Sequence, residues 1–266
     1  MKTVVITGSA RGFGLAMHRL FRERNCHIVV NDISKEALEN AKKELEGISG
    51  SGKIICVQGD ITKSEDIQNI IDTTVNETGS IDFWINNAGV NQPDQPIWEL
   101  DESIINRMIE IDLKGTILCS KLVMKAMIKQ GHGQIFNVEG YGSNDAVQTG
   151  LSIYGTSKRA VTYFTEALAH EAEDQNTNVF VGKITPGIMI TNFINTSLGD
   201  GAHIELPEKT KKVYNILGEY PETIANFMVD KILNNKKNKA QFTWLTNTRA
   251  AFRFMTCWMN KRDFFK

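Results

Sequence analysis

Residues 2–14 read Lys-Thr-Val-Val-Ile-Thr-Gly-Ser-Ala-Arg-Gly-Phe-Gly, and this stretch decides the fold. It begins with a mostly apolar, β-branched run that is typical of a buried strand. Gly8, Gly12 and Gly14 follow, and a helical pattern continues to about Arg24. Glycines between a strand and a helix permit a tight turn, and the helix N-terminus then presents free N–H groups to an anion. A plain strand–turn–helix junction is the alternative, but three glycines favour a phosphate-binding turn.

Strand and helix patterns alternate through the rest of the chain. Apolar runs predict strands at 26–30, 53–58, 81–85, 134–138, 178–184 and 241–246. Helical periodicity predicts helices at 34–46, 62–78, 101–130, 152–170 and 221–234, the third of them bent near Gly115. This order predicts an α/β protein, namely a single-domain doubly wound Rossmann fold with a parallel sheet of about seven strands flanked by helices.

Composition narrows the class of protein. The chain has 266 residues, is 23% charged and carries a net charge of −1, so it shows no electrostatic footprint for nucleic acid. The histidines are scattered and the four cysteines are widely spaced, which predicts no metal site and a reducing compartment. We see neither a signal peptide nor an apolar run long enough to span a bilayer, and therefore expect a cytoplasmic protein.

Two aspartates mark possible contacts with a nucleotide. Asp32 ends the second predicted strand, about 20 residues after the glycine turn, where an acid can accept both ribose hydroxyls of an adenosine and repel a 2′-phosphate. It therefore favours NAD over NADP, whereas Arg11 in the glycine loop pulls weakly towards NADP. Asp32 as a helix cap is the alternative, but Ser34 can fill that role. Asp60 follows the third strand, where it can bind an adenine edge or simply stabilise a turn.

Tyr154 and Lys158 form the candidate catalytic pair. They are four residues apart at the start of a predicted helix, so they lie on one helix face. A nearby positive charge can lower the pKa of a phenol, which would make Tyr154 a proton donor and acceptor near neutral pH. Ser143 lies upstream, just past a strand end, and can hydrogen-bond a substrate oxygen. Taken alone, a Tyr and a Lys that merely share a helix face are the commoner case.

The remaining segments surround the expected cleft. Asn86-Asn-Ala-Gly89 lies at the carboxyl end of a strand, where ligands bind in open parallel sheets. The run 192–206 lacks periodicity, and a loop of that length is usually functional, often as a lid. The tail 247–266 is aromatic and basic, and it can form an amphipathic helix. We expect it to pack on its own domain or on a partner subunit rather than on a membrane surface.

Four motifs in this order and spacing resemble the short-chain dehydrogenase/reductases. They are Thr7-Gly8-x3-Gly12-x-Gly14, Asn86-Asn-Ala-Gly89, Tyr154-x3-Lys158 and Pro186-Gly187, and the resemblance covers residues 1–246. It implies that Tyr154 transfers a proton and that Lys158 lowers the pKa of Tyr154 and binds the nicotinamide ribose. It also implies cofactor contacts at Gly8, Arg11, Gly12, Phe13, Gly14, Asp32, Asp60, Ile61, Asn87, Ala88, Gly89, Pro186, Gly187 and Thr191.

The sequence departs from this family at two places. The family usually has a Ser-Ser pair after the fifth strand, but Glu139-Gly140 stand there, and the catalytic serine would be Ser143, eleven residues before Tyr154 instead of thirteen. The family's long helix also carries an asparagine in a proton relay, and Asp112 occupies that position. An acid can still organise water, but its charge alters the relay.

A narrower resemblance is to the chlorophyll b reductase branch. It rests on Gly133-x-Ile-Phe-Asn-Val-Glu-Gly-Tyr-Gly-Ser143, on Tyr154-Gly-x-x-Lys158-Arg159 and on the character of the tail, and it explains the shifted serine. That branch reduces a formyl group on a chlorin and is generally associated with NADPH, with which Asp32 conflicts. We take it as a relationship of the scaffold more than of the substrate.

These observations predict an NAD(H)-dependent oxidoreductase, with NADP as the alternative cofactor, that acts on a small-molecule carbonyl or alcohol. The hydride would move between the nicotinamide and the substrate carbon. A protein that binds NAD(H) as a sensor or scaffold, with little catalysis, is the alternative function, and the departures at Gly140 and Asp112 motivate it. The resemblance also implies a homodimer or homotetramer paired through helices 101–130 and 152–173.

Overall fold

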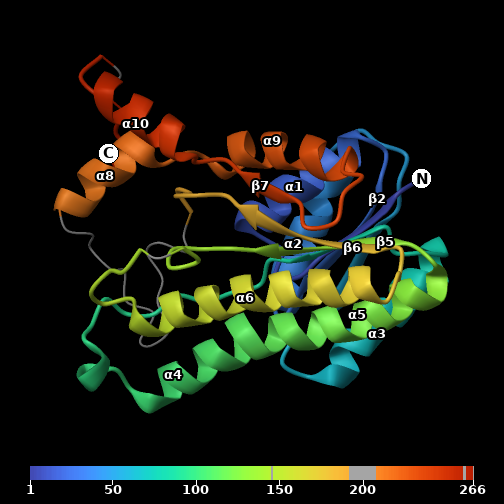
Figure 1. Ribbon diagram of the computed structural model, residues 1–266. Coiled ribbons are helices and arrows are strands. Elements are labelled where there is room, and N and C mark those ends of the chain that lie inside the picture. Colours follow the sequence, from blue (N-terminus) through green and yellow to red (C-terminus); the bar gives the residue numbers. More distant parts are fainter. Residues whose placement is uncertain (145, 192–207, 260–261, 266) are drawn as a thin grey trace.

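A single parallel sheet of seven strands organises the protein. The structure, a computed structural model, describes residues 1–144, 146–191, 208–259 and 262–265 (Figure 1). The strand order is β3-β2-β1-β4-β5-β6-β7 and every pair is parallel. The strands are β1 (Thr3–Ile6), β2 (His27–Asp32), β3 (Ile54–Gln58), β4 (Phe83–Asn86), β5 (Gly133–Val138), β6 (Val179–Thr185) and β7 (Gln241–Thr243). The predicted doubly wound Rossmann fold is confirmed.

Helices cover both faces of the sheet (Figure 1). One face carries α1 (Gly12–Glu23), α2 (Lys35–Glu46) and α9 (Pro221–Leu233), and the other carries α3 (Ser64–Thr78), α5 (Thr116–Gln130) and α6 (Ser152–Asp174). Successive strand side chains point to opposite faces. Val4 and Ile6 of β1 therefore join the core beneath α1 and α9, whereas Val5 joins the core beneath α3 and α5. The central strands β1 and β4 are buried at every position, whereas the edge strands β3 and β7 are largely half-buried.

The predicted long helix at 101–130 is three consecutive segments. These are α4 (Glu102–Met108), the π-helical segment η2 (Ile109–Gly115) and α5. The sequence predicted a bend near Gly115, and the wider π turn takes its place. A side chain at Gly115 would meet Ile61 Cδ1 at 2.7 Å, so the segment packs closely on the loop after β3. Isolated π turns often occur at functional sites, and this one buries Asp112 completely.

The C-terminal part contains one helix that the sequence did not predict. This is α8 (Glu208–Leu217), and none of its side chains is fully buried. The helix α10 (Asn247–Thr256) follows β7, and the Thr246 hydroxyl caps it by accepting from Arg249 N at 3.2 Å. A short 3₁₀ helix, η1 (Ile97–Glu99), precedes α4. The loop predicted at 192–206 lies outside the described residues.

Candidate active site

The glycine turn is built to approach other backbone closely. Gly8 has φ +57°, and a Cβ there would meet Ala88 Cα at 2.8 Å. Asn87 holds the turn in place, because its Nδ2 donates to the carbonyls of Thr7 and Gly8 at 3.0 Å each. A Cβ on Gly14 would meet Ser9 Cα at 2.7 Å. The loop after β1 and the segment after β4 are therefore held together by these contacts.

The start of α1 is open in front of this turn. Gly12 has φ +58°, and a Cβ added there would have no heavy-atom neighbour within 4 Å. Arg11 occupies the N-cap position, but its side chain makes no capping hydrogen bond and is exposed. The first-turn N–H groups of α1 thus receive no cap from Arg11, which is the arrangement that suits an anionic phosphate.

A buried Ser9–His18 pair beneath the turn was not predicted from the sequence. Ser9 Oγ donates to Ile6 O at 2.6 Å and lies 3.0 Å from His18 Nε2. Because the single hydroxyl proton is used on Ile6 O, Nε2 is the donor to Ser9. Asn31 N also donates to Ser9 Oγ, at 3.3 Å. Burial without a charged partner lowers the pKa of His18 to about 3, so this imidazole is neutral at physiological pH.

The two aspartates predicted to contact adenosine have different surroundings. Asp32 ends β2 and is 6% exposed, and its Oδ1 accepts from Ser34 N at 3.1 Å. Ser34 itself caps α2, accepting from Ala37 N at 3.2 Å, so the cap alternative for Asp32 does not apply. Asp60 Oδ1 accepts from the N and Oγ1 of Thr62 at 2.9 and 2.8 Å. Asp60 therefore stabilises a turn, the second role that the sequence suggested for it.

Two other residues that were predicted to contact the cofactor have side chains buried in the hydrophobic core. Phe13 is 5% exposed and belongs to the core beneath α1. Ile61 is 6% exposed and packs in the core on the other face of the sheet. Their side chains therefore serve packing.

Tyr154, Lys158 and Asp112 form a buried cluster between α6 and η2. Lys158 Nζ lies 5.5 Å from the Tyr154 ring centroid and 3.5 Å from Asp112 Oδ2. Asp112 Oδ1 accepts from Val90 N at 2.8 Å. The missing side chain of Gly89 opens this space, because a Cβ there would lie 3.4 Å from both Asp112 Oδ1 and Lys158 Nζ. The structure thus brings the Tyr–Lys pair and Asp112 together, as the sequence predicted.

The electrostatics of the cluster differ from the sequence expectation. Burial raises the pKa of the Tyr154 phenol, and this effect outweighs the opposing charge of Lys158. Asp112 and Tyr214 of α8 raise it further. Burial also raises the pKa of the Asp112 carboxyl, which the Lys158 charge opposes. Lys158 lowers the pKa of Tyr154 as expected, but burial raises it by more, so the net pKa lies above its ordinary value and not below it as predicted from the sequence.

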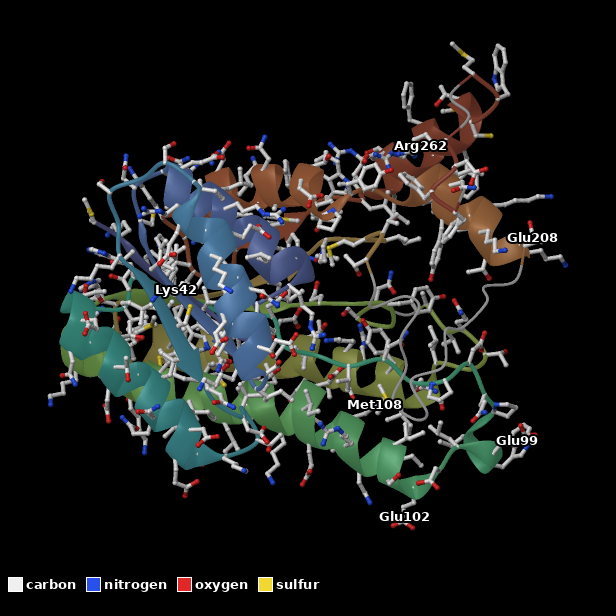
Figure 2. The ribbon with its side chains drawn as sticks, turned by 180° about the vertical axis from the view of Figure 1, so that it is seen from behind. Lys42, Glu99, Glu102, Met108, Glu208 and Arg262 are labelled. Atoms are coloured by element: carbon white, nitrogen blue, oxygen red, sulfur yellow. The ribbon has the colours of Figure 1, made fainter. Side chains whose placement is uncertain are left out.

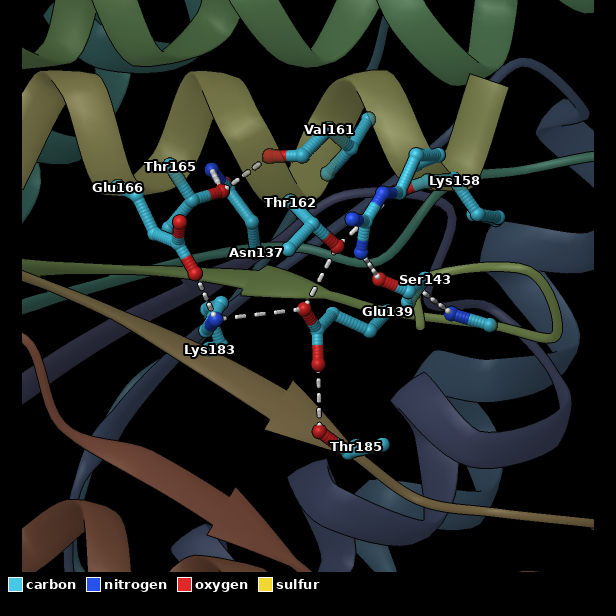
Figure 3. Close-up of polar contacts among 12 residues, drawn as sticks. Asn137, Glu139, Ser143, Lys158, Val161, Thr162, Thr165, Glu166, Lys183 and Thr185 are labelled. Atoms are coloured by element: carbon cyan, nitrogen blue, oxygen red, sulfur yellow. Dashed lines mark hydrogen bonds and ion pairs between the residues drawn. The ribbon is translucent and has the colours of Figure 1, made fainter. Parts of the chain in front are cut away.

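Gly140 packs directly against the Tyr154 phenol, and Ser143 lies close to Gly140. A Cβ on Gly140 would overlap Tyr154 Oη and would lie 3.0 Å from Tyr154 Cζ. Gly140 N donates to Ser143 Oγ at 3.1 Å, so the loop folds back and brings the serine hydroxyl close to Gly140. Ser143 is 9% exposed, and Arg159 Nη1 fixes its carbonyl at 2.9 Å (Figure 3).

Glu139 is the centre of a buried network that the sequence did not predict (Figure 3). Its carboxylate accepts from Thr162 Oγ1 at 2.7 Å and from Thr185 Oγ1 at 2.6 Å. Lys183 Nζ lies 3.8 Å away and pairs with Glu166 at 2.6 Å. The network joins the residue that follows β5 to α6 and β6. A buried carboxylate needs such partners, and no local sequence spacing reveals them because they come from two later elements, α6 and β6.

Gln92 positions the start of α6, which has no side-chain cap of its own. Its Oε1 accepts from Ile153 N and Tyr154 N at 3.0 and 2.8 Å, and its Nε2 donates to Gly150 O at 2.6 Å. Gln92 is 1% exposed although it lies in a stretch that reads as a polar loop. A contact across 62 residues leaves no local signal that sequence reasoning can use.

The turn after β6 completes the described part of the site. Pro186 is buried, and Gly187 has φ +77°, where a Cβ would meet Leu245 Cβ at 2.6 Å. Thr191, the last predicted cofactor contact, is half-buried at the edge of the described range. Within residues 1–144, 146–191, 208–259 and 262–265, no three His, Cys, Asp or Glu side chains gather as metal ligands. Over the same residues, no helix is both long and apolar enough to cross a bilayer.

Comparison with known proteins identifies the family. Residues 2–200 match the short chain dehydrogenase family, so the chain belongs to it. A protein of Arabidopsis thaliana named "Probable chlorophyll(ide) b reductase NYC1, chloroplastic" is 31% identical over 280 residues, covering 99% of this chain and 54% of its own length. The predicted resemblance to that branch is confirmed. The chain thus spans about half the length of this relative.

Two further proteins show how widely this scaffold is used. The 3-oxoacyl-acyl-carrier-protein reductase of Thermotoga maritima is 32% identical over 215 residues, covering 79% of this chain and 80% of its own. The crystal structure of levodione reductase superposes with a TM-score of 0.81 at 22% identity, over 94% of this chain and 98% of its own. The latter likeness shows the fold alone.

Proposed function

We propose that this chain is an NAD(H)-preferring oxidoreductase that interconverts a carbonyl and an alcohol, with Tyr154 as the proton-transfer residue. The observation that carries the proposal is the buried cluster of Tyr154, Lys158 and Asp112 at the carboxyl end of the sheet, opposite Gly140 and Ser143. It lies beside the open glycine turn. Reductases among the relatives support the reaction class.

The residues at the glycine turn fit a dinucleotide. Gly8 and Gly12 have positive φ, and the open space at Gly12 faces a helix start that Arg11 does not cap. The pyrophosphate would bind here. Asp32 would accept from the adenosine ribose hydroxyls, and Asn87 to Gly89 would line the nicotinamide side, with Pro186, Gly187 and Thr191 closing it. When bound, the nicotinamide supplies or accepts the hydride.

The protein's own groups handle the proton. In the reducing direction Tyr154 Oη donates a proton to the substrate oxygen, and the hydroxyl of Ser143, which lies 3.1 Å from Gly140 N, orients that oxygen. The Lys158 ammonium stabilises the phenolate that remains. Asp112 moderates that effect, because it lies 3.5 Å from the same ammonium. The raised pKa of Tyr154 keeps the phenol protonated, which suits a proton donor.

Replacing Tyr154 tests the mechanism. Tyr154→Phe removes the hydroxyl but keeps the ring, so NADH binding should persist while turnover across a panel of aldehydes and ketones is lost. Undiminished turnover would exclude Tyr154 as the proton donor. Tight NADH binding by the unmodified protein, without turnover on any carbonyl, would instead favour a sensor or scaffold.

Cofactor choice is tested by titrating the protein with NADH and NADPH, followed by fluorescence. We expect NADH to bind at least tenfold more tightly, about 1.4 kcal/mol, because a 2′-phosphate would face the Asp32 carboxylate. Asp32→Asn should erase the preference, whereas Asp60→Asn is the matched control, since the Asp60 carboxylate serves the Thr62 turn. A preference of the unmodified protein for NADPH would contradict the assignment of Asp32 as the ribose ligand. It would indicate that Arg11 outweighs Asp32 in the choice of cofactor.

We also infer that the enzyme pairs with copies of itself through α5 and α6. Ile128 of α5 is 47% exposed and Tyr163 of α6 is 77% exposed, which leaves apolar surface on these helices. Sedimentation of the protein and of Tyr163→Glu should show a dimer or tetramer that the charge weakens. A monomer at every concentration would exclude it.

A further inference from the structure

The helix α10 has an inverted distribution of polar and apolar side chains. A helix on the surface of a soluble protein turns its apolar stripe inward and its charges outward. Here every exposed residue from 251 to 259 is apolar. The large ones are Phe252, Phe254, Met255, Trp258 and Met259, which are 62%, 48%, 68%, 72% and 68% exposed. We call these five side chains the α10 outer face.

The arginines of the same segment point back into the protein. Arg253 Nη1 donates to Leu217 O and Gly218 O at 2.8 and 3.0 Å, and its Nη2 pairs with Glu219 at 2.6 Å. Arg262 also donates to Gly218 O, at 3.0 Å. These cations lie at the C-terminus of α8, where the helix dipole favours positive charge. The polar side of α10 thus contacts the C-terminus of α8. The outer face therefore points away from the protein.

The outer face stands clear of the rest of the protein. Figures 1 and 2 show α10 projecting beyond the body, with α8 beside it. The aromatic residues at the end of the chain behave differently, because Phe264 packs edge-on against Tyr220 at 5.0 Å between centroids. The expectation that the tail packs on its own domain therefore holds for residues 262–265 but not for the outer face. Contiguous apolar surface of this kind marks an interaction site.

The charge of the surrounding sequence points to the occupant. Residues 208–266 contain 12 Lys and Arg against 5 Asp and Glu, a net charge of +7, whereas residues 1–207 carry −8. Lys209 and Lys212 of α8 are exposed beside α10. A second copy placed against this face by a two-fold axis would bring these lysines near their own counterparts, which opposes self-association there. Nucleic acid would need cations on the outer face itself, and the face has none.

We propose that the α10 outer face docks on an anionic lipid bilayer. Phe, Met and Trp side chains would enter the boundary between headgroups and acyl chains, and the lysines of α8 would meet the anionic headgroups. An apolar face beside a basic segment is the combination that such peripheral helices use. The helix would lie on the membrane without crossing it.

Vesicle binding by the full chain tests the proposal. The probe is sedimentation with vesicles of phosphatidylcholine alone or mixed with phosphatidylglycerol. We expect binding to the mixed vesicles to be at least tenfold tighter than to phosphatidylcholine, and to weaken as salt is raised. The triple variant Phe252→Ser/Met255→Ser/Trp258→Ser should lose binding. Trp98→Ser is the matched control, because Trp98 is 82% exposed on η1, away from this face.

A second readout keeps the test independent of variant stability. Brominated phosphatidylglycerol should quench the tryptophan fluorescence of the unmodified protein, and Trp258→Phe should remove that quenching. Absence of vesicle binding, or equal binding to neutral and anionic vesicles, would overturn the proposal. It would also be overturned if the triple variant converted an oligomer to a monomer, since a second copy would then cover the face.

Discussion

Gly140→Ala is the sharpest probe of the proposed active site. A Cβ at this position would overlap Tyr154 Oη and would lie 3.0 Å from Tyr154 Cζ and 3.2 Å from Lys158 Cγ. Relieving the overlap requires the phenol to move by about 1 Å, and a displacement of that size can lower a rate by about 100-fold, or about 2.7 kcal/mol. The expected loss is in kcat/KM for carbonyl reduction, because the Tyr154 hydroxyl no longer reaches the substrate oxygen.

The assay is NADH oxidation with whichever carbonyl the panel shows to be active, with NADH affinity measured in parallel. NADH affinity should be retained, because the glycine turn is built from β1 and α1 rather than from the Gly140 loop. Gly155→Ala is the matched control on the neighbouring residue of α6. Its added Cβ would meet Gly142 Cα at an ordinary 3.8 Å, so activity should stay and the helix should gain up to about 1 kcal/mol. Unchanged kcat/KM in Gly140→Ala would refute the inferred contact.

Two further predictions concern charge. Asp112→Asn removes a carboxylate that raises the pKa values of both Tyr154 and Lys158, so the limb of the kcat/KM pH profile assigned to Tyr154 should move to lower pH; an unshifted profile would contradict the coupling. His18 has a pKa lowered from 6.5 to about 3, so the unfolded chain binds more protons between these values and native stability falls as pH drops below 6.5, by about 2 kcal/mol between pH 7 and pH 5. His18→Gln keeps a donor to Ser9 but does not titrate, and urea unfolding at both pH values should show a smaller loss in the variant.

Most of the fold could be predicted from local sequence patterns. The β-branched runs and helical periodicity located all seven strands and most helices, because each element buries a continuous apolar stripe that sequence displays directly. The helix α8 was missed, since it has no fully buried side chain within its ten residues. The π turn η2 was predicted only as a bend at Gly115, because the same apolar spacing fits both geometries.

The candidate site was predictable only where its geometry is local. Tyr154 and Lys158 share a helix face by their spacing of four, and the structure keeps them together with Asp112. Gln92 and Glu139 have partners in distant segments, so no local pattern identifies them. The pKa of Tyr154 was predicted in the wrong direction because burial, which a sequence does not display, outweighs the lysine charge.

The departures at positions 139, 140 and 143 are one rearrangement rather than three independent changes. A serine at 140 would place its Cβ on the Tyr154 hydroxyl, so that residue must be glycine while the phenol keeps its position. Ser143 supplies the hydroxyl that a serine at 140 would otherwise provide. Its side chain reaches Gly140 N because the loop turns at Gly142, where φ is +92°. Position 139 then needs no hydroxyl, and its carboxylate links Thr162 of α6 to Thr185 of β6. The Ser143 hydroxyl and the Tyr154 phenol therefore both pack against Gly140, the hydroxyl at its backbone N–H and the phenol in the space that a side chain would fill.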